Sequence, residues 1–223
     1  MCGRYTITVT EEELMLRFML ERGTPFYEPR YNIAPSQMVP AIINDGKQNK
    51  LGQLRWGFIP SWADDPKIGY KMINARVETV ASKPAYRASF KSKRCIIPAD
   101  GFYEWKVMKD GKQPMRILLK NGELFGMAGL YDTWESPEGK KISSCTIITT
   151  GPNKTMEGIH DRMPIILRTQ DEATWLDRSI QDVRLLQELL EKPYPDSEMR
   201  VYPVRKEVGN VKNDSIENIK EVS

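Results

Sequence analysis

The residue with the clearest chemical potential is Cys2, which only Met1 precedes. Methionine aminopeptidases remove an initiator methionine when the next side chain is small, so we expect processing to leave Cys2 with a free α-amine beside its thiol. An α-amine has a pKa of about 7.7–8, against about 10.4 for lysine, and is therefore more nucleophilic near neutral pH. A 1,2-aminothiol condenses with an aldehyde to an imine, and the adjacent thiol closes a five-membered thiazolidine with high effective molarity. Position alone does not decide the role, because a cysteine commonly packs as a small apolar side chain.

Three further side chains have the chemistry to move or hold protons during such a reaction. His160 is the single histidine of the chain, and an imidazole titrates near neutral pH, as a general acid–base must. Glu104 is expected on a strand between two aromatic residues, an apolar setting that raises the pKa of a carboxyl group. Asn74 offers a donor and an acceptor but does not ionise, which suits orienting a hydroxyl or an amine. Their structural alternatives are a structural histidine, a buried partner of an arginine, and a cap for a turn.

Composition narrows the class of protein without naming a partner. The chain has 223 residues, 40% of them hydrophobic, enough for one large domain or two small ones with a core that needs no metal. Lys and Arg number 33 against 30 Asp and Glu, a formal charge of +3. A balance so close to neutral does not by itself indicate a nucleic-acid-binding protein, so any phosphate-binding surface must come from local clustering.

The cysteine pattern and the apolar runs indicate the expected compartment. Three cysteines without a CxxC pair favour a reducing environment over a disulfide framework, and with a single histidine they make a zinc site improbable. No leader-like segment opens the sequence, and no apolar run approaches the roughly 18 residues of a membrane span. We therefore expect a cytoplasmic protein with no membrane contact, no metal and no cofactor.

The elements that must position these residues can be predicted from hydrophobic patterning. Residues 3–9 alternate as a strand, and Thr10 with Glu13 forms a capping box that opens a helix. An apolar stripe of Leu14, Phe18 and Met19 continues that helix, which we expect to end near residues 23–25. Further strands are predicted at 39–43, 51–56, 95–98, 101–106, 114–119, 124–130, 142–149 and 199–203, and helices at 170–177 and 180–191.

Many strands, few helices and no βαβ alternation favour an α+β class, with a single domain whose curved, mixed, barrel-like sheet is flanked by helices. We expect this domain to span residues 1–213 and a polar, flexible tail to span 214–223. The segments at 30–36, 56–62, 74–78, 101–106 and 159–164, most of them between predicted elements, are rich in aromatic residues, proline and arginine. Loops of this composition on a rigid sheet commonly carry function.

Seven segments that include the candidate residues also follow one another in a characteristic order. They are MCGRY at 1–5, RYNIAP at 30–35, WGFIPSW at 56–62, INARVET at 73–79, CIIPADGFYEWK at 95–106, IHDRMP at 159–164 and VGNVKN at 208–213. Together they resemble the SOS-response-associated peptidase (SRAP) family of abasic-site processing proteins, over nearly the whole chain. The resemblance implies a single domain that crosslinks to abasic sites in single-stranded DNA during the DNA damage response and shields them from strand cleavage. It implies the reactive roles for Cys2, Asn74, Glu104 and His160.

This chemistry agrees with the residue types. An abasic deoxyribose is mostly a closed hemiacetal, and only its ring-opened form presents an aldehyde. Opening requires proton transfer at the ring oxygen, which suits His160, and imine formation requires proton transfer that suits Glu104. We expect lyase-type imine chemistry at Cys2, with peptidase activity limited to removal of the chain's own first residue.

Several side chains are candidates for DNA contact. Arg4 and Arg76 each lie two residues from a reactive candidate, and guanidinium groups match phosphate geometry, with Arg162 a weaker candidate. Trp62 and Trp105 could stack on the bases beside the abasic gap, with Pro35 as a wedge. Core packing is the alternative for the tryptophans, and an ion pair with Glu78 is the alternative for Arg76. The basic run at 83–94 lines a groove or forms a solvated face.

Two other classes remain open at this level. An N-terminal-nucleophile amidohydrolase or amidotransferase would also begin with cysteine after methionine removal, with the thiol attacking an amide. A non-catalytic module that binds single-stranded or modified DNA would keep the Arg and Trp contacts and make Cys2 dispensable. The expected partner is single-stranded DNA containing abasic sites, bound by a monomer that associates with the nucleoid when on DNA.

Overall fold

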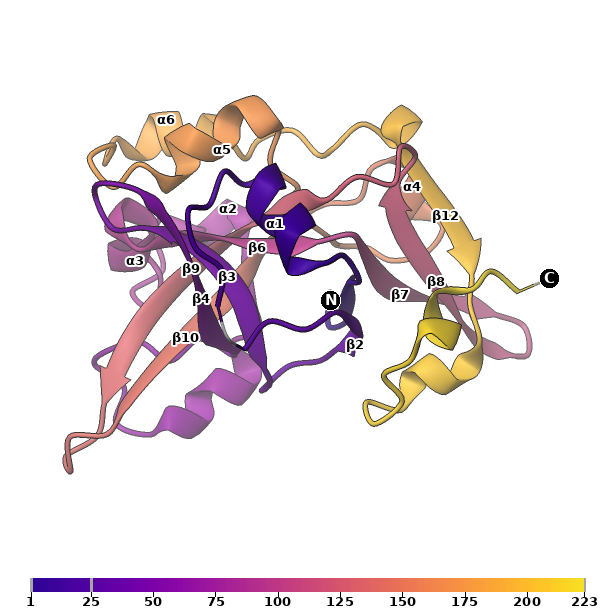
Figure 1. Ribbon diagram of the computed structural model, residues 1–223, viewed down its shortest axis with the longest axis horizontal. Helices are drawn as coiled ribbons and strands as arrows, with labels where there is room; N and C mark the ends of the chain where they lie inside the picture. Colours follow the sequence, from indigo (N-terminus) through magenta and orange to yellow (C-terminus); the bar gives the residue numbers. More distant parts are fainter. Residues whose placement is uncertain (1, 25, 223) are drawn as a thin grey trace.

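The fold is organised around a ring of five hydrogen-bonded strands, in a computed structural model that describes residues 2–24 and 26–222 (Figure 1). β10 pairs in parallel with β4, and the remaining neighbours β4–β3, β3–β6, β6–β9 and β9–β10 are antiparallel, which closes the ring. Closure removes the exposed edges on which sheets aggregate. The ring strands are β3 (Met38–Asn44), β4 (Asn49–Trp56), β6 (Arg94–Ala99), β9 (Phe125–Glu135) and β10 (Lys141–Thr150).

Two short strands continue the ring at the far end of β10. β5 (Asn74–Arg76) pairs in parallel with β10 just beyond β4, and β11 (Met163–Pro164) pairs antiparallel with the last residues of β10. Both short strands belong to segments that carry a candidate residue. The end of β10 is therefore the point where two of the segments chosen from sequence meet.

A second, antiparallel sheet lies beside the ring, in the order β12-β8-β7-β1-β2. β6 runs through Asp100 directly into β7, so one long stretch of chain links the two sheets. This stretch carries Glu104, and β1 pairs with it. The strands are β1 (Tyr5–Ile7), β2 (Arg30–Ile33), β7 (Gly101–Met108), β8 (Gly111–Leu119) and β12 (Met199–Pro203).

Short helices flank the sheets, with α5 and α6 above the ring in the view of Figure 1. None of the helices in the described part of the chain is long and apolar enough to cross a membrane. The α-helices are α1 (Glu11–Arg17), α2 (Val77–Val80), α3 (Arg87–Ser92), α4 (Lys154–Glu157), α5 (Thr169–Leu176) and α6 (Val183–Glu188). The 3-10 helices are η1 (Pro66–Lys71), η2 (Asp196–Glu198), η3 (Lys206–Gly209) and η4 (Ile216–Ile219).

The predicted fold class is confirmed: one domain with a mixed, barrel-like sheet and flanking helices. The capping box of Thr10 and Glu13 is also present. The predicted apolar stripe is wrong at Met19, which is 86% exposed, because the helix ends at Arg17 and Met19 takes a positive φ of 50° that turns it outward. The sequence-based boundaries also make the last helix too long and leave β2 and β5 as loops.

The C-terminal residues that were expected to form a flexible tail are instead packed against the second sheet. Asp214 forms an ion pair with Arg30, the side chain of Asn218 is fully buried, and the N–H of Val222 donates to the carbonyl of Pro203 at 3.0 Å. Polar composition does not predict this packing, because the residues that these C-terminal residues bind are distant in sequence. The segment supplies specific hydrogen bonds in place of apolar burial.

Candidate active site

The start of the chain is held against β7 by the antiparallel pairing of β1. Tyr5 lies opposite Phe102, and the N–H of Tyr103 donates to the carbonyl of Arg4 at 2.9 Å. Continuing this register toward the N-terminus places Gly3 opposite Glu104, and the next residue, Cys2, is near enough to Glu104 to feel its charge. The Cys2 side chain is fully buried, and burial together with the charge of Glu104 raises the pKa of its thiol well above the ordinary value. The thiol is therefore neutral at physiological pH.

Glu104 is the carboxyl group at the centre of this arrangement. It is only 3% exposed, and burial raises its pKa to about 8. A buried carboxyl group without full compensation is more stable protonated, because the low-dielectric surroundings penalise the charged form. At neutral pH Glu104 is thus a carboxylic acid that can donate a proton.

His160 approaches Glu104 from the loop between α4 and β11. Its Nε2 lies 3.8 Å from Oε2 of Glu104, and the backbone N–H of Arg162 donates to its Nδ1 at 3.0 Å. Oδ1 of Asp161 also lies 2.8 Å from Nδ1, which would favour a proton there. The amide of Arg162 is a fixed donor, whereas the Asp161 side chain is 84% exposed and free to rotate. We therefore assign the neutral tautomer with its proton on Nε2, facing Glu104.

The pKa values of these two groups are shifted in opposite directions. Burial lowers the pKa of His160 from its ordinary value, while burial raises that of Glu104. Near pH 7 a protonated carboxyl therefore faces a neutral imidazole, rather than a carboxylate facing an imidazolium. Two neighbouring titratable groups whose pKa values are pushed apart commonly take the acid and the base roles of one reaction.

Asn74 is brought to the same end of β10 by the loop between β4 and β5, in which the backbone at Gly57 passes close to that at Gly69. Gly57 has a φ of 137°, and a Cβ there would lie 2.7 Å from the carbonyl oxygen of Gly69, so the loop's two ends cross only with glycine. Trp56 Nε1 then donates to the carbonyl of Ile73 at 2.9 Å, which fixes the start of β5. Within residues 2–24 and 26–222, neither the oxygen nor the nitrogen of the half-buried Asn74 amide has a hydrogen-bond partner.

A buried amide without partners costs free energy unless a ligand satisfies it. Asn74 pairs with Ile147 of β10, and the segment that carries His160 reaches Thr149 of the same strand through Arg162, whose Nη2 donates to the Thr149 carbonyl at 2.6 Å. The structure thus brings Cys2, Glu104 and His160 together directly, and attaches Asn74 to the same region through β10.

The two candidate DNA-contact residues nearest Cys2 are already engaged within the protein. The Arg4 guanidinium donates to Oδ1 of Asn32 at 2.8 Å and to the carbonyls of Val208 and Gly209 at 2.6 and 3.0 Å. It also lies 5.7 Å from the ring centre of Trp105, which packs in a small apolar cluster beside it. Arg4 therefore anchors the VGNVKN segment to the strand that carries Cys2.

At the other flank, the ion pair expected for Arg76 is formed by a different arginine. Arg162 binds Glu78 through both carboxylate oxygens, at 2.6 and 3.0 Å. Arg76 is exposed and, within the described residues, makes no ion pair. Of the arginines chosen from sequence, Arg76 has the guanidinium most available to a phosphate. In the basic run at 83–94, Arg94 is only 2% exposed and donates to backbone carbonyls, so that residue is structural.

Trp62 and Pro35 are presented by rigid loops. Trp62 is 61% exposed, although Ser61 beside it donates to Asp132 at 2.8 Å and the carbonyl of Ala63 accepts from the ring of Trp134 at 2.6 Å. Pro35 occupies a turn in which Ser36 takes a φ of 73°, a conformation that favours glycine. An exposed aromatic ring on fixed backbone can stack on a base with little loss of entropy.

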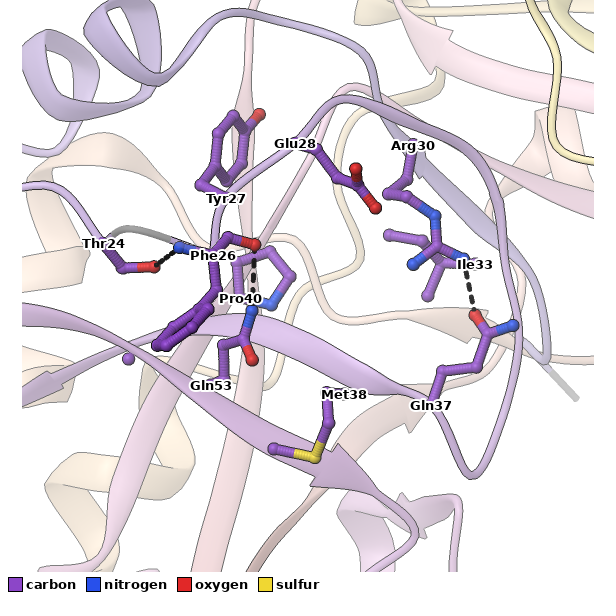
Figure 2. A pocket seen from close by; sticks show the side chains of 11 residues that line it. Thr24, Phe26, Tyr27, Glu28, Arg30, Ile33, Gln37, Met38, Pro40 and Gln53 are labelled. Carbon is purple, nitrogen blue, oxygen red and sulfur yellow. Dashed lines mark hydrogen bonds between the residues drawn. The ribbon is translucent and has the colours of Figure 1, made fainter.

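One hollow of the surface lies away from these residues, and several of its polar groups bind one another. This hollow has a volume of about 240 Å³. Figure 2 shows its lining, where Gln53 donates to the carbonyl of Phe26 and Arg30 donates to Gln37. None of the four reactive candidates lines it. Within the described residues no cluster of three or more His, Cys, Asp or Glu side chains is arranged to hold a metal ion.

These features define a single-domain protein with a ring-shaped sheet, a cysteine at its second position and a neutral acid–base pair beside that cysteine. A family model described as SOS response associated peptidase (SRAP) matches residues 1–211. The chain belongs to this family.

Proteins similar to this chain carry a common name. The abasic site processing protein YoqW of Bacillus subtilis (strain 168) is 52% identical over 222 residues, covering 98% of this chain and 99% of that protein. The abasic site processing protein YedK of Escherichia coli (strain K12) is 32% identical and covers 100% of both chains. A crystal structure of a protein from Bacteroides thetaiotaomicron shares the fold with a TM-score of 0.88 and 26% identity, covering 99% of this chain and 100% of that one.

Proposed function

We propose that this protein processes abasic sites in single-stranded DNA by forming a covalent bond between Cys2 and the ring-opened sugar. The observation that carries the proposal is the Glu104–His160 pair, 3.8 Å apart, beside the buried Cys2. Relatives named abasic site processing proteins at 52% and 32% identity over nearly the whole chain support it. The reaction requires removal of Met1, a step that falls on a residue outside the described part of the chain.

The first chemical task is to open the closed sugar. A base must take the proton of the C1 hydroxyl while an acid protonates the ring oxygen, so that the ring C–O bond breaks and the aldehyde forms. The Nε2–H of neutral His160 can protonate the ring oxygen while the hydroxyl proton passes to one oxygen of the protonated Glu104 carboxyl and the proton on its other oxygen returns to Nε2, so both groups end as they began. Asn74 supplies an amide that can hydrogen-bond a sugar hydroxyl.

The state of the thiol then sets the order of bond formation. Because the Cys2 thiol is neutral, the α-amine attacks the aldehyde first and forms a carbinolamine. Glu104 donates a proton to the departing hydroxyl, water leaves, and an imine forms. The thiol next adds across the C=N bond, its sulfur bonding to carbon and its proton ending on nitrogen. One water is released overall, and the ring closes with high effective molarity.

The same raised thiol pKa argues against the amidohydrolase alternative. In that mechanism the sulfur itself attacks an amide, which requires a thiolate or a base that generates one. Burial of Cys2 opposes thiolate formation. A glutaminase assay should therefore show no activity, and a positive result would revive that alternative.

A gel experiment tests the proposal. Untagged protein is incubated with a single-stranded oligonucleotide from which uracil has been excised, and the products are separated under denaturing conditions. Wild-type protein should give a heat-stable covalent band, and Cys2→Ala should give none. Cys2→Ser keeps the amine but lacks the thiol, so its product should be an imine that borohydride traps and that otherwise reverses. The same oligonucleotide with uracil retained is the matched control.

Each outcome has a distinct meaning. A normal band with Cys2→Ala would refute a covalent role for this residue and favour a non-catalytic DNA-binding module. A heat-stable band with Cys2→Ser, without borohydride, would refute ring closure by the thiol. The crosslink should also protect the abasic site from strand cleavage by alkali, which the length of the labelled DNA reports.

A further inference from the structure

The β7–β8 hairpin that follows Glu104 and the nearby η3 carry four lysines, of which the motifs include only Lys106. Lys106, Lys109 and Lys112 lie on the β7–β8 hairpin, and Lys206 lies on η3, which packs against β8. None of the four forms an ion pair with any residue of the described ranges, whereas Arg4, Arg30 and Arg162 are all engaged within the protein. These lysines are therefore cations whose charge no carboxylate in the described chain neutralises by direct contact.

The hairpin and η3 enclose a shallow bowl with a fixed shape. Gln113 Nε2 donates to the carbonyl of Val204 at 2.8 Å, and the N–H of Val204 donates to the carbonyl of Pro114 at 3.0 Å. These bonds tie the base of the hairpin to the segment that leads into η3. The bowl has a volume of about 220 Å³ and is lined by Met108, Asp110, Gly111, Lys112, Gln113 and Lys206.

The bowl lies further along the hairpin from the candidate active site. Its first residue on β7, Met108, lies four residues beyond Glu104, about 13 Å along the strand at the usual rise. That separation is comparable to twice the distance between successive phosphates of an extended single strand. Burial is the main cause of the lowered pKa of His160, and the positive charge of Lys112 is near enough to that imidazole to add a small part.

We propose that Lys112 and Lys206, the hairpin lysine surface, bind the phosphate backbone of the single strand on one side of the abasic nucleotide. The identity of the strand rests on the proposed function. Arg76 lies on β5, at the opposite flank of the site, so the backbone would run from Arg76 past Cys2 to the hairpin lysine surface. Asp110 in the bowl opposes this attraction, but it faces two lysines in the same lining.

Salt dependence of binding tests this surface. Fluorescence anisotropy is measured with a labelled single strand that carries a tetrahydrofuran analogue of the abasic site, which has no aldehyde and cannot crosslink. In the Lys112→Gln, Lys206→Gln double variant, the slope of log affinity against log salt should fall by about 1.4, since each phosphate contact on a single strand contributes about 0.7. Taking the two proteins to bind equally at about 1 M salt, this difference in slope makes the double variant bind roughly 25-fold more weakly than the wild type at about 0.1 M.

The matched control replaces two exposed lysines in other hairpin turns, Lys47→Gln and Lys140→Gln, which keep the same total charge change. Its slope and affinity should remain those of the wild type within about twofold. Equal slopes for the two double variants would overturn the hairpin lysine surface, whatever the covalent assay shows. Conversely, failure of the wild type to crosslink natural abasic DNA would refute the proposed chemistry. The salt dependence of binding would still decide whether the hairpin lysine surface binds the strand.

Discussion

Replacing Glu104 by glutamine should stabilise the folded protein at neutral pH, although it removes a proposed catalytic group. Glu104 has a pKa of about 8 in the folded state, against an ordinary value of 4.5. Between these two values the unfolded chain has released the proton while the folded chain still holds it. Since the unfolded state binds fewer protons, the free energy of unfolding falls as pH rises through this window. Below the window both states are protonated, and this contribution to stability is fully present.

The size of the effect follows from the width of the window. Each pH unit within it costs about 1.36 kcal/mol, so a change from about pH 5 to about pH 7.5 should remove about 3 kcal/mol from the wild type. Glutamine has the shape of the protonated acid and does not titrate. The Glu104→Gln variant should therefore match the wild type near pH 5 and exceed its free energy of unfolding by about 3 kcal/mol near pH 7.5.

Urea unfolding followed by tryptophan fluorescence at several pH values measures this difference directly. Glu123→Gln, at an exposed position in the turn before β9, is the matched control, and its difference from the wild type should stay constant across the same range. A difference between the wild type and Glu104→Gln that does not change with pH would show that Glu104 is ionised in the folded protein. Its assignment as a proton donor at neutral pH would then fail.

Other perturbations separate catalysis, binding and stability. His160→Ala should slow crosslinking by about 10²–10⁴-fold, the usual contribution of general acid–base catalysis, with the Kd for the tetrahydrofuran strand unchanged within about twofold; equal rates would remove His160 from the mechanism. An N-terminal tag that blocks the Cys2 amine should abolish the covalent band, and a tagged protein that crosslinks normally would exclude the amine. Trp62→Ala should weaken single-strand binding by about 1–3 kcal/mol without lowering Tm, since the ring is 61% exposed. Asn32→Ala should lower the free energy of unfolding in urea by about 2 kcal/mol or more, because its amide binds the carbonyls of Val208, Asn210 and Asn213; a loss below about 0.5 kcal/mol would contradict this anchoring role.

The long strands were predictable because their side chains alternate or form buried apolar runs over several residues. The predicted strand at 199–203 coincides with β12, and the predicted segments at 95–98 and 101–106 fall within β6 and β7. The short strands β5 and β11 have three and two residues, too few for a periodic pattern to appear. Ring closure depends on the parallel pairing of β4 with β10, between residues about 90 positions apart, which no local pattern encodes.

The candidate site was predictable where the signal was local and hidden where it was not. The apolar neighbours of Glu104 in sequence were enough to predict a raised pKa, and the structure gives a value of about 8. Burial of Cys2 entered the sequence analysis only as the alternative to a reactive role, because nothing local in the sequence decides whether a thiol at this position packs against the core. The role of Arg4 as an anchor was equally hidden, since it bonds the Val208 carbonyl across 204 positions of sequence.

On the proposed mechanism, the distribution of charge explains why so weakly basic a protein can bind and modify DNA. At neutral pH the Cys2 thiol and the Glu104 carboxyl are both uncharged, as burial in a low-dielectric site requires, so no charge has to be desolvated before the sugar enters. The attraction for phosphate is instead placed at the exposed flanks, on Arg76 and on the hairpin lysine surface, where water still screens it. Salt should therefore weaken binding while leaving proton transfer inside the site intact. Conversely, raising the pH above about 8 ionises Glu104, removes the proton that dehydrates the carbinolamine, and should slow imine formation without releasing the DNA.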